Sequence, residues 1–374
     1  MTETKTPQKK LGRIYSLDIA RGFIILVAIF LGNIPGGNGE YEWARHARWE
    51  GLPLLDMLFP AFLTLFGIGM AVAYRNGIKW KKVLRRTIIL FAIGLVYNGL
   101  VNWSIDLTTW RITGVLQLYA IVGLVVVILI WINRSWIFAV SVSLFVLFSY
   151  SALLSIISAS CTGGALVPDC YSLVKIDLLI FSENHLWQQG RRGYDPEGIM
   201  TMFSAISNVL FGYAAGRILV IKRETGATKY LAFLAIGIAS LVPILLTFSP
   251  IIKRIWTPAY AASTAAITIF LFALIYFLVD QLFRESHKRF IGVSVLEALG
   301  RNSLIIYFGR GLISRVLAAI NVPFITEEVR VSDYLVALFT HFSSHPKIIY
   351  AIFISCCWIL LAILLHRKKI YVRA

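Results

Sequence analysis

The chain has 374 residues, of which 58% are hydrophobic and 15% are charged, and its mean hydropathy is +0.76. This composition excludes an ordinary soluble domain and indicates an integral membrane protein. The formal net charge of +17 would suit a nucleic-acid-binding protein, but the Lys and Arg residues fall mostly in alternate loops. Basic residues accumulate in that way on the cytoplasmic side of membrane proteins. We therefore expect a lipid bilayer, and no nucleic acid, around this chain.

Apolar stretches of about 20 residues, long enough to cross a bilayer as helices, recur along the whole chain. They predict an all-α fold, a polytopic bundle of about ten transmembrane helices in one domain over residues 14–366. Short tails precede it at 1–13 and follow it at 367–374. The basic start leads into a span with polar residues and no small-residue cleavage site, so we expect no cleavable signal peptide. The predicted spans are 14–34, 52–74, 87–104, 113–132, 136–157, 199–221, 230–249, 259–281, 302–320 and 346–366.

Ten spans place all the basic clusters on one side of the membrane, which predicts that both termini are cytoplasmic. These clusters are 5–13, 75–86, 222–229, 284–289 and 367–373, together with Arg134. The opposite side receives segment 158–198, whose mixture of Gly, Pro, acidic residues and Trp predicts a structured cap over a covered site. Cys161 and Cys170 lie in this segment and would form a disulfide in an oxidising compartment, although spacing alone does not establish the bond.

The first span carries polar residues at both ends. Asp18 and Arg21 are three residues apart on one helical face. They either form a structural ion pair or leave Arg21 to hold an anionic cofactor that enters from the cytoplasm. Asn33 ends the span, where its amide either satisfies local backbone or donates a hydrogen bond to a developing oxyanion.

His46 lies between the first two spans, and Asp56 follows it inside the second. By itself the histidine would be read as a solvated loop residue. A carboxylate inside a hydrophobic segment needs a partner, however, and an imidazole is able to serve as a general base near neutral pH. The pair therefore predicts a catalytic site in which Asp56 orients His46.

Three further segments on the same side combine polar and aromatic residues. Arg111 at the mouth of the fourth span either anchors to lipid headgroups or binds substrate, and Gln117 lies inside that span. Trp187, among hydrogen-bonding residues of the cap, suits a sugar ring. Asp195 and Glu197 either cap the sixth span or accept hydrogen bonds from a sugar.

Arg301 and Asn302 begin the ninth span. Arg301 either reaches the membrane interface along its aliphatic stem or meets a phosphate group. We find no phosphate-binding Gly-rich loop, no zinc-ligand array and no serine-hydrolase motif in the sequence, so we expect no metal and no ATP.

Taken in order, these motifs resemble the heparan-α-glucosaminide N-acetyltransferase family over nearly the entire chain. Each motif is weak alone, but their order and spacing are specific. The motifs are SLDIARG at 16–22, Asn33, HARWEG at 46–51, Asp56, Phe59-Pro60, RITGVLQ at 111–117, CTGG at 161–164, NHLW at 184–187, YDPEG at 194–198, GRNS at 300–303 and RKKIY at 367–371.

The resemblance implies transfer of an acetyl group from cytoplasmic acetyl-CoA to the amine of a glucosamine-type sugar on the outer face. The family's active-site histidine and asparagine match His46 and Asn33 in this chain. Basic residues near the cytoplasmic ends, Arg21, Arg86 and Arg301 among them, are available for the CoA phosphates, and the neighbouring Asp18 and Asn302 are predicted to belong to the same cofactor site. A homodimer is also implied. Only 13 residues precede the first span, as in compact bacterial members, which suggests a bacterial inner membrane and puts heparan sulfate itself in doubt as the acceptor.

Two other functions remain open at this point. An O-acyltransferase acting on cell-envelope glycans would use the same base on an alcohol. A sugar or solute transporter would also explain many spans with buried charge, but it predicts repeat-like halves with interrupted helices, which the sequence does not display. For the acetyltransferase, pantetheine must thread between helices to reach His46 from the opposite side, so we expect a cavity within the bundle.

Overall fold

The structure is a computed structural model, and it describes residues 13–36, 40–104, 106–223, 225–283, 290–324 and 327–371, with the side chains of 322–328 left out. The basic cluster at 284–289, nearly all of the predicted tail at 1–13 and the end of the tail at 367–374 lie outside these residues.

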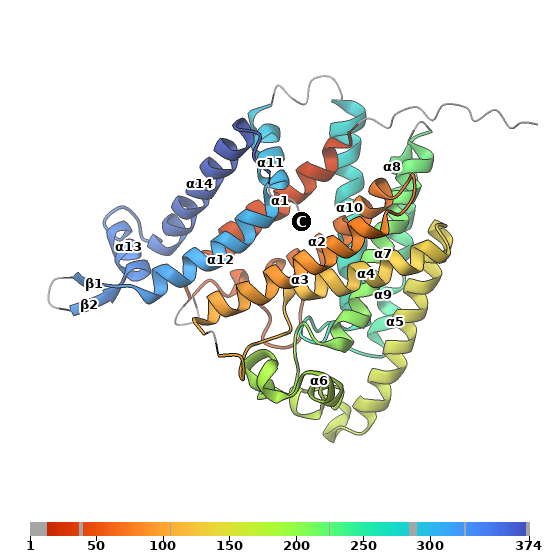
Figure 1. Cartoon of the computed structure of the whole chain (residues 1–374), viewed down its shortest axis with the longest axis horizontal. Helices are drawn as coiled ribbons and strands as arrows, with labels where there is room; N and C mark the ends of the chain where they lie inside the picture. Colours follow the sequence, from red (N-terminus) through yellow and green to blue (C-terminus); the bar gives the residue numbers. More distant parts are fainter. Residues whose placement is uncertain are drawn as a thin grey trace, which may run out of the picture.

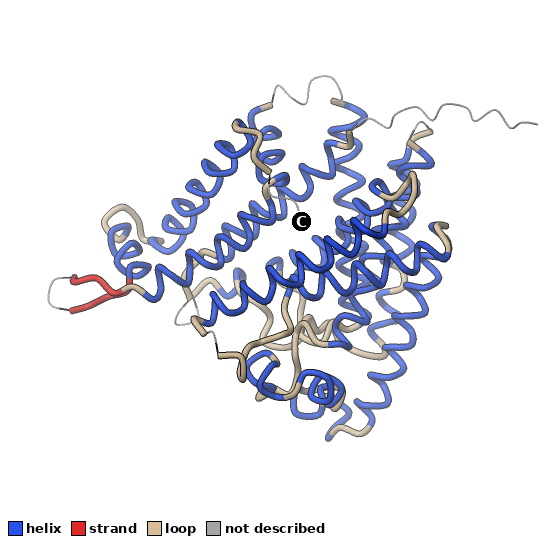
Figure 2. The backbone as a smooth tube through the Cα atoms, viewed as in Figure 1, coloured by secondary structure: helices blue, strands red, loops and turns tan. Residues whose placement is uncertain are grey.

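The described chain is an all-α bundle, as predicted (Figure 1). Nine of its helices are long and apolar enough to cross a membrane, or ten spans if one bent pair of helices counts as a span. The helices are α1 Tyr15–Gly32, α2 Leu54–Ala73, α3 Trp80–Asn102, α4 Val115–Ile132, α5 Trp136–Ala159, α6 Val174–Phe181, α7 Ile199–Lys222, α8 Ala227–Ala239, α9 Val242–Leu246, α10 Pro258–Tyr276, α11 Ile291–Arg301, α12 Ser303–Ala319, α13 Val331–Phe339 and α14 Pro346–Arg367. The strands β1 Asn321–Phe324 and β2 Glu327–Arg330 form one antiparallel hairpin in register Asn321 to Arg330 (Figure 2).

Several spans differ in detail from the prediction. Helix α3 begins at Trp80 rather than at 87, because the Lys and Arg residues that lower its hydropathy are good helix formers. The seventh span consists of α8 and α9, and Pro243 occupies the first turn of α9, where a proline cannot continue the preceding helix. Helix α12 makes a 76° bend with α11 rather than forming a straight ninth span by itself.

The centre of the bundle is the contact between α2 and α7. A Cβ atom on Gly67 would lie 2.0 Å from the backbone oxygen of Val209, and one on Gly212 would lie 1.9 Å from that of Thr64. Small residues allow two backbones to approach in this way within a membrane. This contact fixes the position of α2, which carries Asp56.

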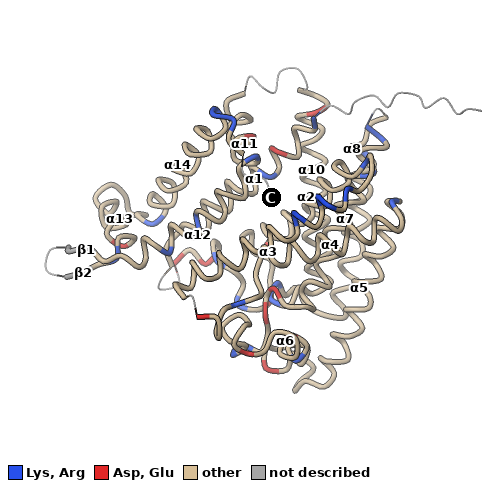
Figure 3. Tube along the Cα trace, in the orientation of Figure 1, with Lys and Arg blue, Asp and Glu red and all other residues tan. Residues whose placement is uncertain are grey.

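The two ends of the bundle differ in composition. We call the end at which α1 begins the upper end, and the end around α6 the lower end (Figure 1). Lys and Arg gather at the upper ends of α8 and α14 (Figure 3). Most loop backbone gathers around α6, where residues 158–198 fold into α6 and short 3₁₀ turns, as expected of a structured cap (Figure 2).

Candidate functional site

Asp56, in the first turn of α2, is the centre of a polar cluster near the lower end. Its side chain is 1% exposed. Oδ1 accepts a hydrogen bond from Lys253 Nζ at 2.8 Å and also contacts His46 Nδ1, while Oδ2 accepts one from the backbone N–H of Ala47 at 2.9 Å. The start of a helix favours a negative charge, because the first N–H groups have no partner within the helix. Asp56 is thus a buried carboxylate with three donors, and the expected contact between His46 and Asp56 is present.

Two loops that are far apart in sequence bring this cluster together. Glu50 pairs with Ile252 in an antiparallel bridge, and the Gly51 N–H donates to the carbonyl of Ile251 at 2.9 Å. Gly51 has a φ of +129°, a conformation that favours glycine. This bridge carries Lys253 to a carboxylate 197 positions earlier in the chain.

His46 presents one ring nitrogen to this cluster and leaves the other for chemistry. Nδ1 contacts Asp56 Oδ1 and lies 3.0 Å from Lys253 Nζ. The side chain is 51% exposed. With Nδ1–H donating to the carboxylate, the lone pair on Nε2 is available to take a proton.

Asn33 does not join this cluster. Its amide nitrogen donates to the carbonyl of Ile29 at 2.6 Å, and Ser314 donates to its amide oxygen at 3.2 Å. Within the described ranges, no contact joins Asn33 to His46, Asp56 or Lys253. The amide therefore satisfies local backbone, one of the two predicted alternatives, and its role toward an oxyanion stays a prediction.

A second cluster on the lower side surrounds Asp195 and Glu197. Asp195 accepts hydrogen bonds from the Thr113 hydroxyl at 2.6 Å and from the backbone N–H groups of Trp187 at 2.8 Å and Glu197 at 2.9 Å. Arg111 donates to Glu197 Oε2 at 2.5 Å. These donors occupy both carboxylate oxygens of Asp195, whereas the hydrogen bond found for the Glu197 carboxylate among the described residues is that of Arg111 to Oε2.

The two clusters lie within electrostatic reach of each other. Burial raises the pKa of Glu197, and both Arg111 and Lys253 oppose that rise. The aromatic ring of Tyr194 lies 5.3 Å from that of Trp49 and 5.6 Å from that of Trp187, measured between centroids. These rings connect the loop that carries His46 to the cap.

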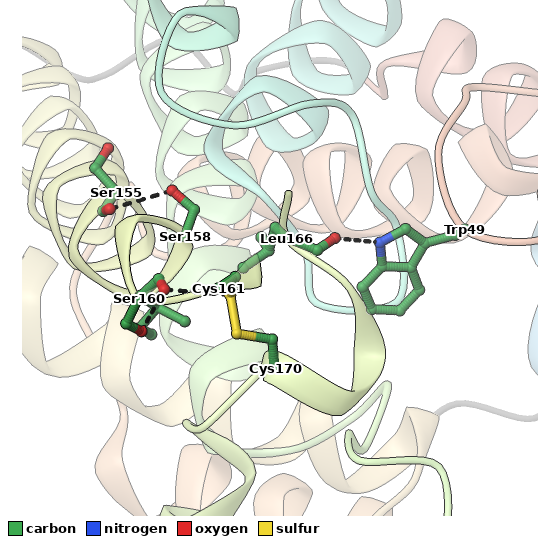
Figure 4. Close-up of a disulfide and its surroundings, with 8 residues drawn as sticks. Trp49, Ser155, Ser158, Ser160, Cys161, Leu166 and Cys170 are labelled. Atoms are coloured by element: carbon green, nitrogen blue, oxygen red, sulfur yellow. Dashed lines mark hydrogen bonds between the residues drawn. A yellow bond between two sulfur atoms is a disulfide. The ribbon is translucent and has the colours of Figure 1, made fainter. Parts of the chain in front are cut away.

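A disulfide within the cap and a hydrogen bond to Trp49 hold the cap against the loop between α1 and α2 (Figure 4). Cys161 and Cys170 are bonded, with their Cα atoms 5.8 Å apart, which confirms the predicted pairing. Between them in sequence, the carbonyl of Leu166 accepts a hydrogen bond from Trp49 Nε1 at 2.7 Å. The disulfide thus restrains the cap segment that contacts the His46 loop.

Gln117 is buried, and neither of its amide atoms has a hydrogen-bond partner in the part of the chain that the structure describes. It lies between α3 and the start of α4, where a Cβ atom on Gly94 would be 2.4 Å from its Oε1. The structure brings it into neither polar cluster, and its predicted contact with substrate stays a prediction.

A cavity of about 660 Å³ occupies the bundle on the upper side, as the threading of a donor would require. Residues from α1 to α4 and from the α11–α12 bend line it. They include four of the predicted cofactor residues, Asp18, Arg21, Arg86 and Arg301. Asn302 is not among the lining residues, because its amide nitrogen donates to the carbonyl of Ala298 at 3.1 Å within the bend.

One ion pair at the polar end of this cavity differs from an alternative that the sequence offered. Asp18 forms its ion pair with Arg13 rather than with Arg21, and Arg13 also bridges to Glu297 at 2.8 Å. The side chain of Arg21 instead lies against Gly69 on α2 and lines the cavity. The reason is that Arg13 precedes the helix and reaches both carboxylates from outside it.

The cavity extends toward the His46 cluster along α2. Phe59, one helical turn beyond Asp56, lines it together with Phe62, Phe66, Tyr119 and Tyr307. Neither His46 nor Asp56 is a lining residue. The cavity therefore ends about one turn of α2 short of the carboxylate that contacts His46.

Sequence reasoning missed Lys253, which completes the His46 cluster, and Thr113, which holds Asp195. Lys253 carried a faint signal, since it is a basic residue in a loop that the topology places opposite the basic clusters. Its partner could not be identified, because the contact depends on how two distant loops pack.

Comparison with known proteins adds an independent observation. A family model described as heparan-alpha-glucosaminide N-acetyltransferase, catalytic, matches residues 13–230. The mouse heparan-alpha-glucosaminide N-acetyltransferase is 24% identical over 99% of this chain and 62% of its own length, and the human protein of that name is 24% identical over 96% of this chain and 59% of its own length. The chain thus spans about three fifths of these relatives. Because the family model covers more than half of the chain, this protein belongs to the heparan-alpha-glucosaminide N-acetyltransferase family.

Proposed function

We propose that this chain is a transmembrane N-acetyltransferase that moves an acetyl group from acetyl-CoA on the cytoplasmic side to the amine of a glucosamine-type sugar on the outer face. The observation that carries the proposal is the paired geometry of the bundle. An arginine-lined cavity near the upper end and a His46–Asp56 cluster near the lower end are separated by about one turn of α2.

The donor would enter the cavity with its phosphates toward Arg21, Arg86 and Arg301. The aromatic end of the cavity suits the pantetheine arm and excludes water around the thioester. Arg86 supports this assignment, since its guanidinium lies over the ring of Phe66 at 5.0 Å and hydrogen-bonds to Tyr74, while its buried Nε has no hydrogen-bond partner among the described residues. The planar donor fork of a guanidinium is suited to phosphate.

His46 would act as the general base. As the sugar nitrogen attacks the thioester carbon, Nε2 of His46 takes the proton that the nitrogen loses, and Asp56 stabilises the imidazolium. The tetrahedral intermediate then breaks its C–S bond, and the departing thiolate of CoA recovers the proton. Asn33 is the proposed oxyanion donor, through the second N–H of its amide nitrogen, since the first donates to the carbonyl of Ile29.

Glu197, with Arg111, Trp187 and the structural carboxylate of Asp195, would bind the acceptor. A carboxylate next to an aromatic surface suits the hydroxyl and amine edges and the apolar face of an amino sugar. The proposed setting is a bacterial inner membrane with both termini cytoplasmic and the chain paired as a homodimer. Lys and Arg at the upper end of the bundle support this orientation (Figure 3).

The test is acetyl transfer by the purified protein in nanodiscs. Acetyl-CoA and glucosamine should give free CoA thiol and an N-acetylated sugar, and His46→Ala should abolish turnover. Hydroxylamine cleaves esters and spares amides, so a product that it cleaves would identify an O-acyltransferase instead. Unchanged turnover in the histidine variant would remove His46 from the mechanism.

A further inference from the structure

Lys253 occupies an unusual place in the His46 cluster, because one carboxylate oxygen serves two basic groups. Its Nζ lies 2.8 Å from Asp56 Oδ1 and 3.0 Å from His46 Nδ1. The same Oδ1 contacts His46 Nδ1. The ammonium and the imidazole are therefore direct neighbours. A lysine that only neutralised a buried acid would have no contact with the imidazole.

The position of Lys253 is held by its own loop. The Trp256 N–H donates to the Lys253 carbonyl at 3.0 Å. The loop is closed by the Ile252 N–H, which donates to the Thr257 hydroxyl at 3.0 Å, and by the Thr257 N–H, which donates to the Ile252 carbonyl at 3.1 Å. The bridge between Glu50 and Ile252 joins this loop to the one that carries His46. A backbone held at both sides keeps the ammonium beside the ring.

Other charged groups surround His46 from each packed element, but their contacts lie elsewhere. Arg45 donates to the carbonyls of Ile34 and Pro35, Arg254 donates to that of Arg48, and the Arg48 side chain pairs with Glu42 on an exposed surface. Glu50 is exposed, and Glu197 is within electrostatic reach of Lys253. Among the charged side chains of the described chain, Asp56 and Lys253 are those that touch the imidazole.

These two neighbours act on His46 in opposite directions. The carboxylate favours an imidazolium, whereas the ammonium opposes it, since protonation would put two positive charges about 3 Å apart. At that separation the repulsion changes a protonation equilibrium about tenfold even at the dielectric constant of water. Asp56 alone would orient the ring but would also trap a proton on it.

We propose that Lys253 is a positioning residue that shares the carboxylate of Asp56 and thereby keeps His46 unprotonated, so that Nε2 is ready to accept a proton from the acceptor amine. This inference rests on the proposed acetyltransferase function and deepens it. Asp56 fixes the tautomer and the direction of the His46 ring. Lys253 offsets the negative charge of Asp56, which would otherwise favour a protonated ring that could not act as a base.

The main test is the pH dependence of kcat/KM in three variants. Lys253→Met removes the charge and the donor, Lys253→Gln keeps a donor without the charge, and Lys253→Arg keeps the charge. In Lys253→Met and Lys253→Gln we expect the acid limb, the fall of kcat/KM at low pH, to move to higher pH by about one unit. On the acidic side kcat/KM should be about tenfold lower than in the wild type, with little change on the alkaline side. Lys253→Arg should restore the wild-type limb.

A matched control is available at the surface. Lys347 is 24% exposed and pairs with Glu40, while Lys253 is 22% exposed and pairs with Asp56. Lys347→Met removes the same charge from an ion pair without a histidine, so its acid limb should coincide with that of the wild type. If Lys253→Met does not accumulate as folded protein, Lys253→Gln decides the matter alone.

A chemical titration separates this inference from the proposed function. Diethyl pyrocarbonate acylates neutral imidazole, and mass spectrometry of the peptide that contains His46 follows its modification without any turnover. The pH of half-maximal modification should rise in Lys253→Gln. A wild-type protein that reacts in this way yet transfers no acetyl group would refute the proposed function and leave the inference standing. Equal modification curves, or equal acid limbs with a uniform loss of activity, would overturn the inference.

Discussion

Replacing Asp56 with Asn removes a single charge from the His46 cluster while nearly preserving its shape. The amide oxygen would still accept from the backbone N–H of Ala47, and the buried side chain would occupy the same space. Of the three donors on the carboxylate, only His46 changes its charge during proton transfer. The loss of transition-state stabilisation should therefore be that of one charge-assisted hydrogen bond, about 2–3 kcal/mol.

This energy corresponds to a kcat/KM lowered by about 30- to 150-fold. The assay is release of CoA thiol from acetyl-CoA with glucosamine as acceptor, after thermal unfolding has established that each variant is folded. His46→Ala should lose at least as much activity. The double variant should lose no more than His46→Ala, because residues that act as a unit are not additive.

Asp106 supplies the matched control for the same chemical change. Its carboxylate is exposed and accepts hydrogen bonds from nearby loop residues such as Thr108. Asp106→Asn should retain wild-type turnover within about twofold. The reasoning would be refuted by an Asp56→Asn enzyme that loses less than about threefold, or by a double variant in which the two losses multiply.

Three more outcomes follow from other parts of the structure. Glu197→Gln should raise KM for the sugar more than KM for acetyl-CoA, and equal effects on both would count against its place in the acceptor site. Burial raises the pKa of Asp177 in the cap helix α6 to about 6 from an ordinary value of 3.8, so the folded chain binds this proton more tightly than the unfolded chain. Stability should consequently fall by up to roughly 3 kcal/mol as pH rises from about 4 to about 6, and thermal unfolding should show a weaker fall for Asp177→Asn. Gly212→Ala would place a methyl group 1.9 Å from the Thr64 oxygen and should destabilise the fold by about 1–3 kcal/mol, whereas Gly237→Ala, with nothing within 4 Å of the new methyl group, should leave the melting temperature unchanged or higher.

Hydropathy predicted most of the spans because a chain in lipid must satisfy its backbone hydrogen bonds internally, and a helix does so within one apolar stretch. It failed where the helix and the apolar stretch do not coincide. The basic first turns of α3 are helical although they are polar, and α11 precedes the predicted ninth span as a further helix at 76° to α12. Hydropathy reports which residues lie in lipid, and it contains no term for the angle between two helical segments.

The candidate site was predictable to the extent that its contacts are local. His46 and Asp56 are ten positions apart and flank the start of one helix, so a titratable ring beside a buried carboxylate could be inferred from their types. Lys253 could not be inferred, because its contact depends on a bridge between two loops about 200 positions apart in the chain. The ion pair between Asp18 and Arg21, one of two predicted alternatives, does not form for a related reason: helical periodicity pointed to Arg21, while the chain before the helix supplied Arg13.

Helix α2 connects the two halves of the proposed reaction. Asp56 and Phe59 lie on consecutive turns, the first touching His46 and the second lining the donor cavity. The ring of Phe59 lies 5.2 Å from that of Trp256, which belongs to the loop that holds Lys253. A change at Arg86 should consequently act on the donor and a change at Glu197 on the acceptor. A change at Phe59 should alter the kinetics of both substrates. Phe59 forms the end of the donor cavity, and it also packs against the loop that holds Lys253 beside the general base His46.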